Sequence, residues 1–339
     1  MNNSECRDVV VMSQTHALAV VYSLVFLVGL LLNGFTLKVF FCRSQQQQRS
    51  SSLSIYLKNL VAADFLTCLC LPIRIINYES SSVPVHHVFC SFGASVFYLN
   101  MYASILFIGY IAANRYLKIV HPLGTHVLQK VRAARILSMV TWGFLLAMTA
   151  TYILMSHLSQ GPQDSDIVSC EAMHNEHLSV LYKVIHSCSA AVFLLVLVSL
   201  VFFYYRISRR LSQAQQRQPA SSGSKKLEKS QRNMLVLVSV FCVCFIPYHL
   251  VRIPYAFMEG WHCLESLEIL KRLSIILSVL NVCLDPLIYF IFCKTFRAQL
   301  NLRRMFSVRP PRSDVINQPS SSSGTRAPQD LDCTSTSCP

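Results

Sequence analysis

Charge is what this sequence has least of. Only 14% of its 339 residues are charged, whereas 53% are hydrophobic. A soluble domain carries roughly 25% charged residues, so the composition excludes an ordinary water-soluble protein and indicates a chain that crosses a membrane repeatedly. Nor does the sequence predict a cleavable signal peptide. The first apolar run, near residues 17–41, is too long for one and is predicted to stay as a membrane span.

Three kinds of site are also absent. The 14 cysteines stand mostly alone in apolar runs, and the pairs Cys68/Cys70 and Cys242/Cys244 point to different helix faces, so no zinc site is predicted. The net charge of +14 is not gathered with aromatics into a soluble module, so no nucleic acid polymer is expected as a partner. No nucleophile is paired with a base, and we predict neither an enzyme nor a cofactor.

What the sequence does contain is seven apolar segments of membrane length. A helix of about 20 residues crosses a bilayer core, which predicts an all-α fold, a seven-transmembrane helix bundle. We expect residues 1–16 to lie outside the membrane, 17–293 to form the bundle, 294–306 to form a short amphipathic helix on the membrane surface, and 307–339 to be a disordered tail. The spans run near 17–41, 53–77, 90–114, 133–156, 180–205, 233–257 and 267–292.

The segments between the spans separate by charge. One set holds 13 lysines and arginines against one acid, Glu228, and the other holds nine acids against Arg7 alone. The positive-inside rule places the basic set in the cytoplasm and the N-terminus outside the cell, in a multi-pass plasma-membrane protein. Asn2 begins a glycosylation sequon on the outer side. The four cysteines at polar edges also fall on that oxidising side: Cys6, Cys90, Cys170 and Cys263.

Polar side chains are few inside the spans, and five of them lie at similar depth. They are Asp64 in the second span, Asn100 and Ser104 in the third, and Asn281 and Asp285 in the seventh. Polar groups are costly at this depth, so we predict that they converge on one hydrated site. Alternatively, each is satisfied singly by backbone. Two carboxylates with amide and hydroxyl oxygens suit Na⁺ or shared protons.

Prolines interrupt the hydrogen bonding of three spans. Pro72, Pro247, Pro254 and Pro286 each remove one helix hydrogen bond in spans two, six and seven. Beside a buried polar cluster, this favours a bundle that switches shape, although helices with a proline and no mobility fit the same pattern.

Cations gather at the outer ends of several spans. His249 and Arg252 are three residues apart on one helical face, Lys271 and Arg272 begin span seven, and Arg74 ends span two. Arginine with lysine suits a phosphate group, so an anionic ligand is predicted. Alternatively, these cations form plain surface bridges with the acids Glu259, Glu265 and Glu268.

Short motifs occur in order along the seven spans, and together they resemble class A (rhodopsin-like) G-protein-coupled receptors. The resemblance covers residues 17–306, and it implies an outward-facing ligand pocket and a cytoplasmic cavity for a heterotrimeric G protein. It also assigns the five mid-span polar residues to a sodium site. The motifs are Asn33, Leu60-x-x-x-Asp64, Asn114-Arg115-Tyr116, Trp142, Phe241-x-x-Cys244-Phe245-x-Pro247 and Asp285-Pro286-x-x-Tyr289. The resemblance also implies which residues couple the receptor to the G protein and switch it on: Asn114, Arg115, Tyr116, Tyr204, Phe241, Phe245, Pro247, Pro286 and Tyr289.

Two positions depart from the pattern of that family. Phe245 replaces the usual tryptophan at the base of the pocket, and Asn114 replaces the usual acid before Arg115. An aspartate would hold the arginine in the inactive state, whereas asparagine offers a hydrogen bond without charge. Raised basal signalling is therefore expected.

Within the family, the run Tyr248-His-x-x-Arg252-Ile-Pro-Tyr255 and the cysteines resemble the ADP- and UDP-sugar-sensing purinergic receptors and their orphan relatives. This implies disulfides Cys90–Cys170 and Cys6–Cys263. Three positions depart from that branch: Arg272 replaces the usual glutamate after Lys271, and Tyr182 and His186 replace His and Asn. These changes make the expected pocket more cationic. A lysophospholipid, as in lysophosphatidylserine receptors, is therefore the rival ligand to a nucleotide. Expected ligand contacts are Tyr98, Tyr102, Tyr182, His186, His249, Arg252, Lys271, Arg272 and Arg74.

The expected partners are therefore the membrane, a small anionic ligand, a heterotrimeric G protein of Gi type, and arrestin with receptor kinases acting on the Ser-rich tail. A seven-helix transporter or proton pump is the alternative from another class. It would favour internal repeats or a lysine in the middle of span seven, and the sequence has neither.

Overall fold

The computed structural model of the chain is an elongated bundle of helices. It describes residues 3–44, 51–80, 82–122, 126–158, 170, 176–217, 222–257 and 265–292. The elements are α1 (Asn3–Ser44), α2 (Ser52–Glu79), α3 (Val83–Val88), a π-helical turn η1 (Phe89–Gly93), α4 (Ala94–Val120), a 3₁₀ turn η2 (Val127–Gln129), α5 (Val131–Leu158), α6 (Glu176–Arg217), α7 (Ser222–Phe257), α8 (Glu265–Val279) and α9 (Asn281–Phe292).

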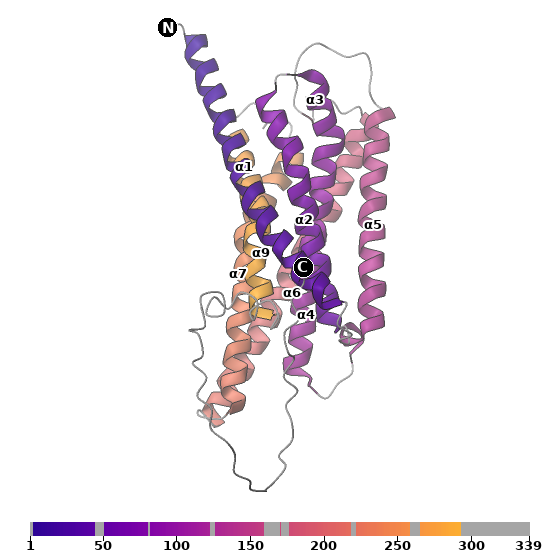
Figure 1. Cartoon of the computed structure of the whole chain (residues 1–339), viewed down its shortest axis with the longest axis vertical. Helices are drawn as coiled ribbons and strands as arrows, with labels where there is room; N and C mark the ends of the chain where they lie inside the picture. Colours follow the sequence, from indigo (N-terminus) through magenta and orange to yellow (C-terminus); the bar gives the residue numbers. More distant parts are fainter. Residues whose placement is uncertain are drawn as a thin grey trace, which may run out of the picture.

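Seven helical segments in the described part are long and apolar enough to cross a membrane, with α3, η1 and α4 forming the third and α8 with α9 the seventh. The predicted all-α, seven-span architecture is confirmed. Figure 1 shows the long helices running along one axis, with α2 between α1 and α5 in this view. The predicted helix at 294–306 and the tail at 307–339 lie outside the described residues.

The helices extend further than the predicted spans. α6 continues to Arg217 and α7 already begins at Ser222, so most of the connecting segment expected at 206–232 is helical. No glycine or proline interrupts α6, and its polar residues beyond the membrane are adequate helix formers, so nothing ends the helix at the bilayer surface. α1 likewise starts at Asn3, inside the segment predicted to precede the first span.

The span that contains α4 is the central one. In its most apolar stretch of 18 residues, 67% of the residues are buried within the protein, against 17% in the corresponding stretches of α5 and α6. α5 and α6 instead expose Met139, Val140, Leu195 and Val198. In a membrane protein such faces contact lipid, because apolar side chains cost nothing there. The outer helices therefore surround α4, which contributes to both polar sites described below.

The seventh span is divided in two. α8 ends at Val279 and α9 begins at Asn281, with Leu280 in a turn between them. Pro286 lacks an N–H, so the carbonyl of Val282 loses its usual helical donor. Asn33 of α1 supplies a replacement, because its Nδ2 donates to the Val282 carbonyl at 2.7 Å. This gives the buried asparagine of the first span a structural role.

Candidate functional site

A cavity of about 550 Å³ opens between helices at the end of the bundle that carries the Cys90–Cys170 disulfide, which we call the disulfide end. Its walls come from α2, α4, α5, α6, α7 and α8. This volume is within the range of small-molecule sites. The opposite end, where Arg115 lies, is called the Arg115 end.

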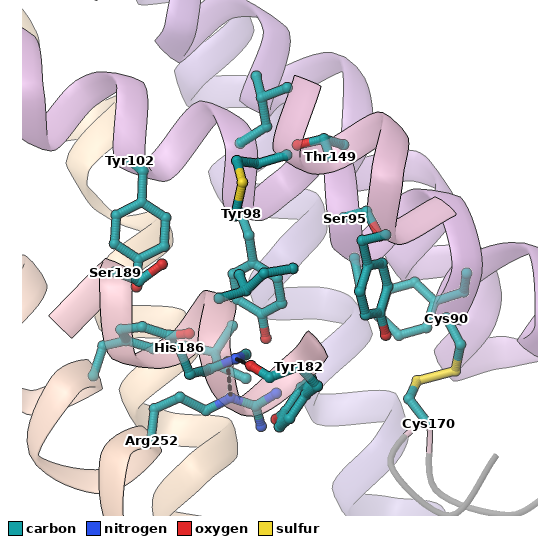
Figure 2. Close-up of a pocket in the computed structure, with 18 of the residues that line it drawn as sticks. Cys90, Ser95, Tyr98, Tyr102, Thr149, Cys170, Tyr182, His186, Ser189 and Arg252 are labelled. Carbon is teal, nitrogen blue, oxygen red and sulfur yellow. Dashed lines mark hydrogen bonds between the residues drawn. A yellow bond between two sulfur atoms is a disulfide. The ribbon is translucent and has the colours of Figure 1, made fainter. Parts of the chain in front are cut away.

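The disulfide belongs to the cavity wall. Cys90 lies in the π-helical turn η1 and is bonded to Cys170, with the two Cα atoms 5.4 Å apart. The predicted Cys90–Cys170 bridge is thus confirmed, and Figure 2 shows it at one edge of the cavity. Cys263 lies outside the described residues, as does Asn2, so the Cys6–Cys263 pair and the glycosylation site stay predictions.

Arg252 of α7 lies at the centre of the polar part of the cavity. Its Nε donates to His186 Nε2 at 3.2 Å. Its guanidinium carbon lies 5.8 Å from the ring centroid of Tyr98, 5.4 Å from Tyr182 and 5.6 Å from Tyr255. Figure 2 shows His186 and Tyr182 beside it. Such rings stabilise a buried cation with their negative faces, and the planar fork of the guanidinium matches the geometry of an oxygen-rich anionic group.

Lys271 and Arg272 of α8 lie on the same side of the cavity as Tyr255 and Glu268. The Lys271 Nζ is 3.2 Å from Glu268 Oε2, and Arg272 Nε is 3.3 Å from Glu268 Oε1. Lys271 also donates to the Tyr255 hydroxyl at 2.9 Å. Of the three acids weighed as partners for the cations, Glu268 makes two bridges, and it does so at the wall of the cavity. Glu259 and the side chain of Glu265 lie outside the part of the chain that the structure describes.

Arg74 of α2 is held differently. Its guanidinium carbon lies 5.4, 5.1 and 4.9 Å from the ring centroids of Tyr22, Phe89 and Phe97. These rings come from α1, η1 and α4. Arg74 lines the cavity, but its contacts join three helices in an aromatic cage.

The cavity brings together eight of the nine residues expected to contact the ligand. They are Tyr98, Tyr102, Tyr182, His186, Arg252, Lys271, Arg272 and Arg74. The ninth, His249, is 2% exposed and is not among the lining residues. Its Nδ1 donates to the Phe245 carbonyl at 2.8 Å, so the Nε2 of the neutral ring accepts from the Tyr102 hydroxyl at 3.2 Å.

Several lining residues were not predicted from the sequence. Among them are Tyr248, Ser95 and the apolar residues Leu106, Phe144, Met148 and Val192. Tyr248 lies inside a motif quoted for the family, but nothing in its spacing marks it as a contact. Glu268 carried a usable signal, because it precedes Lys271 and Arg272 by three and four residues.

An aromatic column runs from the cavity into the bundle. The His249 ring stacks on Phe193 with centroids 3.8 Å apart, and Phe193 stacks on Phe241 at 5.8 Å. Phe241 contacts Phe245 edge-on at 5.2 Å. Since Tyr102 lines the cavity and bonds to His249, a continuous chain of contacts connects the cavity to Phe241 and Phe245, which the family resemblance assigns to switching.

Among the five mid-span polar residues, Asp64 contacts Ser104 and Asp285. Ser104 donates to Asp64 Oδ1 at 3.3 Å, and Tyr289 donates to Asp64 Oδ2 at 2.5 Å. The carboxyl of Asp285 meets that of Asp64, and no other described residue bonds to its oxygens. Asn100 Oδ1 and Asn281 Nδ2 are buried without a hydrogen-bond partner among the described residues. Unpartnered buried oxygens beside a second carboxylate form a set of hard ligands that fits a sodium ion.

At the Arg115 end, the residues of the third-span motif face different ways. Asn114 donates to Ser52 Oγ at 2.9 Å and to the Leu128 carbonyl at 3.0 Å. Arg115 reaches the Phe292 carbonyl at 3.5 Å, and its guanidinium lies 4.7 Å from the Phe292 ring. Tyr116 stacks on Phe203.

Other motif residues have structural partners. Trp142 donates its indole N–H to Asn59 Oδ1 at 2.9 Å, joining α5 to α2. Pro247 and Pro286 lie within α7 and α9, as do Pro72 within α2 and Pro254 within α7. Tyr204 is partly buried against the core of α6 and its neighbours.

A membrane bundle of seven helices, with an open polar cavity at one end and a buried carboxylate cluster below it, defines the class of heptahelical receptors. Comparison with known families agrees. Residues 32–289 match the family described as 7 transmembrane receptor (rhodopsin family), and the chain belongs to this family. It is therefore a receptor in the membrane and not an enzyme, which disfavours the transporter alternative.

Three relatives locate the chain within the family. It is 35% identical to purinoceptor 14 of Bos taurus over 82% of each chain. It is 34% identical to G-protein coupled receptor 87 of Mus musculus, over 84% of this chain and 79% of that one. It is 31% identical to lysophosphatidic acid receptor 5 of Bos taurus, over 88% and 81%. The predicted resemblance to the purinergic and lysophospholipid branch is confirmed.

Proposed function

We propose that this receptor binds a phosphate-bearing ligand in the cavity at the disulfide end, which faces outside the cell, and activates a heterotrimeric G protein at the Arg115 end. The observation that carries the proposal is the grouping of Arg252, Lys271 and Arg272 along one side of the cavity. Three cations with several tyrosine hydroxyls offer the charge-assisted donors that phosphate oxygens need.

The other residues of the cavity wall indicate which chemical group the phosphate is attached to. Tyrosine rings beside Arg252 suit a nucleobase, and the names of relatives include purinoceptors. A second observation favours a lysophospholipid. The cavity wall between α4, α5 and α6 includes four apolar side chains, those of Leu106, Phe144, Met148 and Val192. Phe144 is also 53% exposed on the lipid-facing surface, so an acyl chain would pass there from cavity to membrane.

The test is a G-protein activation assay in transfected cells, with a nucleotide panel beside a lysophospholipid panel. Wild type is compared with Lys271→Ala and Arg252→Ala at matched surface expression. We expect a response to one panel that both variants lose. A response that survives in both would mean that the cations are structural, and it would refute the proposed phosphate site.

The carboxylate cluster is proposed as a sodium site formed by Asp64, Asn100, Ser104, Asn281 and Asp285. Sodium would supply a positive charge that the buried oxygens of Asp285 and Asn100 otherwise lack. We expect replacement of sodium by N-methylglucamine to change agonist potency about three- to tenfold in wild type, as for a modest allosteric coupling. Asp64→Asn should abolish this sensitivity. Sodium sensitivity that persists in Asp64→Asn would place the ion elsewhere.

Coupling is proposed to be of Gi type and to run through Arg115, with Asn114, Tyr116, Tyr204 and Tyr289 as switching residues. Raised basal signalling is part of the proposal, because Asn114 bonds to Ser52 and Leu128 and adds no charge beside Arg115. The tail would be phosphorylated by receptor kinases and recruit arrestin. Pertussis toxin sensitivity of the response tests the G-protein subtype.

A further inference from the structure

Glu268 lies at the cation-rich side of the cavity and is held by donors from two helices. Its Oε2 is 3.2 Å from Lys271 Nζ, and its Oε1 is 3.3 Å from Arg272 Nε. The Tyr255 hydroxyl of α7 donates to the same Oε2 at 3.3 Å and accepts from Lys271 Nζ at 2.9 Å. The carboxylate therefore has a fixed place within a small network.

This network differs from an ordinary surface ion pair. All four side chains line the cavity, and the Lys271 side chain is only 13% exposed. Among the described lining residues, Glu268 is the only acid. It faces a set of four lysines and arginines, made up of Arg74, Arg252, Lys271 and Arg272. The one carboxylate of the cavity is thus bonded to two of the cations that the proposed function assigns to phosphate.

A carboxylate and a phosphate use the same donors. Each presents anionic oxygens to N–H groups at hydrogen-bond distance, so Lys271 and Arg272 cannot serve both fully at once. A phosphate that replaces Glu268 would also leave the carboxylate nearby, since α8 holds its backbone three and four residues away. Repulsion between the two anions at short range grows with the charge of the ligand.

We propose that Glu268 is a tethered competitor for the phosphate of the ligand. It binds Lys271 and Arg272 in the empty cavity, leaves them when the phosphate enters, and sets how much negative charge the site accepts. This inference rests on the proposed function. It makes Glu268 a specificity-determining residue, which favours singly charged phosphate diesters over more highly charged phosphates.

The test uses the full-length receptor purified in detergent, with inorganic pyrophosphate as the probe and the midpoint of thermal unfolding as the readout. Glu268→Gln removes the charge at nearly constant size. We expect it to lower the half-saturating pyrophosphate concentration about tenfold, the equivalent of roughly 1.4 kcal/mol. With dimethyl phosphate, which carries one charge, the gain should be smaller.

Glu79→Gln is the matched control. Glu79 lies at the same end of the bundle, pairs with His16 at 3.1 Å and does not line the cavity. The same loss of charge there should leave half-saturation unchanged. Glu268→Ala repeats the test if the glutamine variant does not fold, and the double variant Glu268→Gln/Lys271→Ala should lose the gain.

The failures of the two proposals are distinguishable. Equal half-saturation in wild type and Glu268→Gln, with binding lost in Lys271→Ala, overturns the competitor role and leaves the phosphate site standing. Weaker binding in Glu268→Gln means that Glu268 positions Lys271, and it also overturns the competitor role. Absence of stabilisation in every variant, including Glu268→Gln, overturns the phosphate site and this inference with it.

Discussion

Arg74 and Arg252 line the same cavity and are each 5% exposed, yet they are buried in different ways. Arg74 lies among three rings that come from α1, η1 and α4. The hydrogen-bond partners of Arg74 are also ring residues, Tyr22 and Tyr78. Arg252 faces rings as well, but its Nε donates to His186 in the wall of the cavity. An aromatic cage favours a cation that stays in place. Polar partners that a ligand can replace favour a cation that binds, so burial alone does not identify a binding residue.

The largest effect is expected from Arg252→Ala. Removing a buried guanidinium that meets a phosphate should reduce agonist potency about 100-fold, since hydrogen bonds to charged groups contribute roughly 1.5–3 kcal/mol. Arg252→Lys keeps the charge without the planar fork and should recover only part of the loss. Concentration–response curves at matched surface expression measure both. Equal potency in Arg252→Ala and wild type would contradict the assignment.

Arg74→Ala should mainly affect stability. Emptying the aromatic cage removes three ring contacts and the packing of a long side chain, at a cost of about 2 kcal/mol. The thermal midpoint of the purified receptor should fall by roughly 5 °C, while potency changes by less than about threefold. A large loss of potency with an unchanged midpoint would show that both arginines bind ligand.

Tyr255→Phe should reduce agonist potency less than Arg252→Ala does. The ring faces both Arg252 and Lys271, whereas the hydroxyl links Lys271 to Glu268. Phenylalanine keeps the ring contacts and removes both hydrogen bonds of the hydroxyl, but Lys271 stays bonded directly to Glu268. Potency should therefore change by only about three- to fivefold, within the range of one net hydrogen bond. A change as large as that of Arg252→Ala would mean that the hydroxyl itself contacts the ligand.

A third arginine, Arg115, extends the comparison to the other end of the bundle, where we expect the smallest effect. Asn114→Asp removes the donor to the Leu128 carbonyl and places a carboxylate one residue from Arg115. Basal G-protein activation should fall by about twofold, the weight of a partly exposed ion pair. Ligand-free activity of the two receptors, normalised to surface expression, measures it. Unchanged basal activity would refute the prediction that Asn114 raises basal signalling.

How far the sequence predicts this molecule depends on the kind of feature. The spans follow from long apolar runs, and the convergence of Asp64 with Asp285 follows from their similar depth. Arg252 and Lys271 are predicted as cations at the outer ends of spans six and seven, and Tyr98 is predicted from the resemblance to purinergic receptors. The position of His249 below the cavity could not be predicted, because three-residue spacing gives a face of a helix and not a depth relative to neighbouring helices. The cage around Arg74 depends on η1, and no sequence pattern predicts that π-helical turn.

The bond from Asn33 to the Val282 carbonyl has a mechanical consequence. It fastens α9 to α1, and Gly29 strengthens the joint, because an added Cβ there would lie 2.9 Å from Val282 and 2.8 Å from Cys68. The turn at Leu280 separates this fastened part of the seventh span from the part that lines the cavity. α8 carries Glu268, Lys271 and Arg272, whereas α9 carries Asp285 and Tyr289 and is bonded to the first helix. The cation cluster and the carboxylate of Asp285 therefore lie on opposite sides of one turn in the same span.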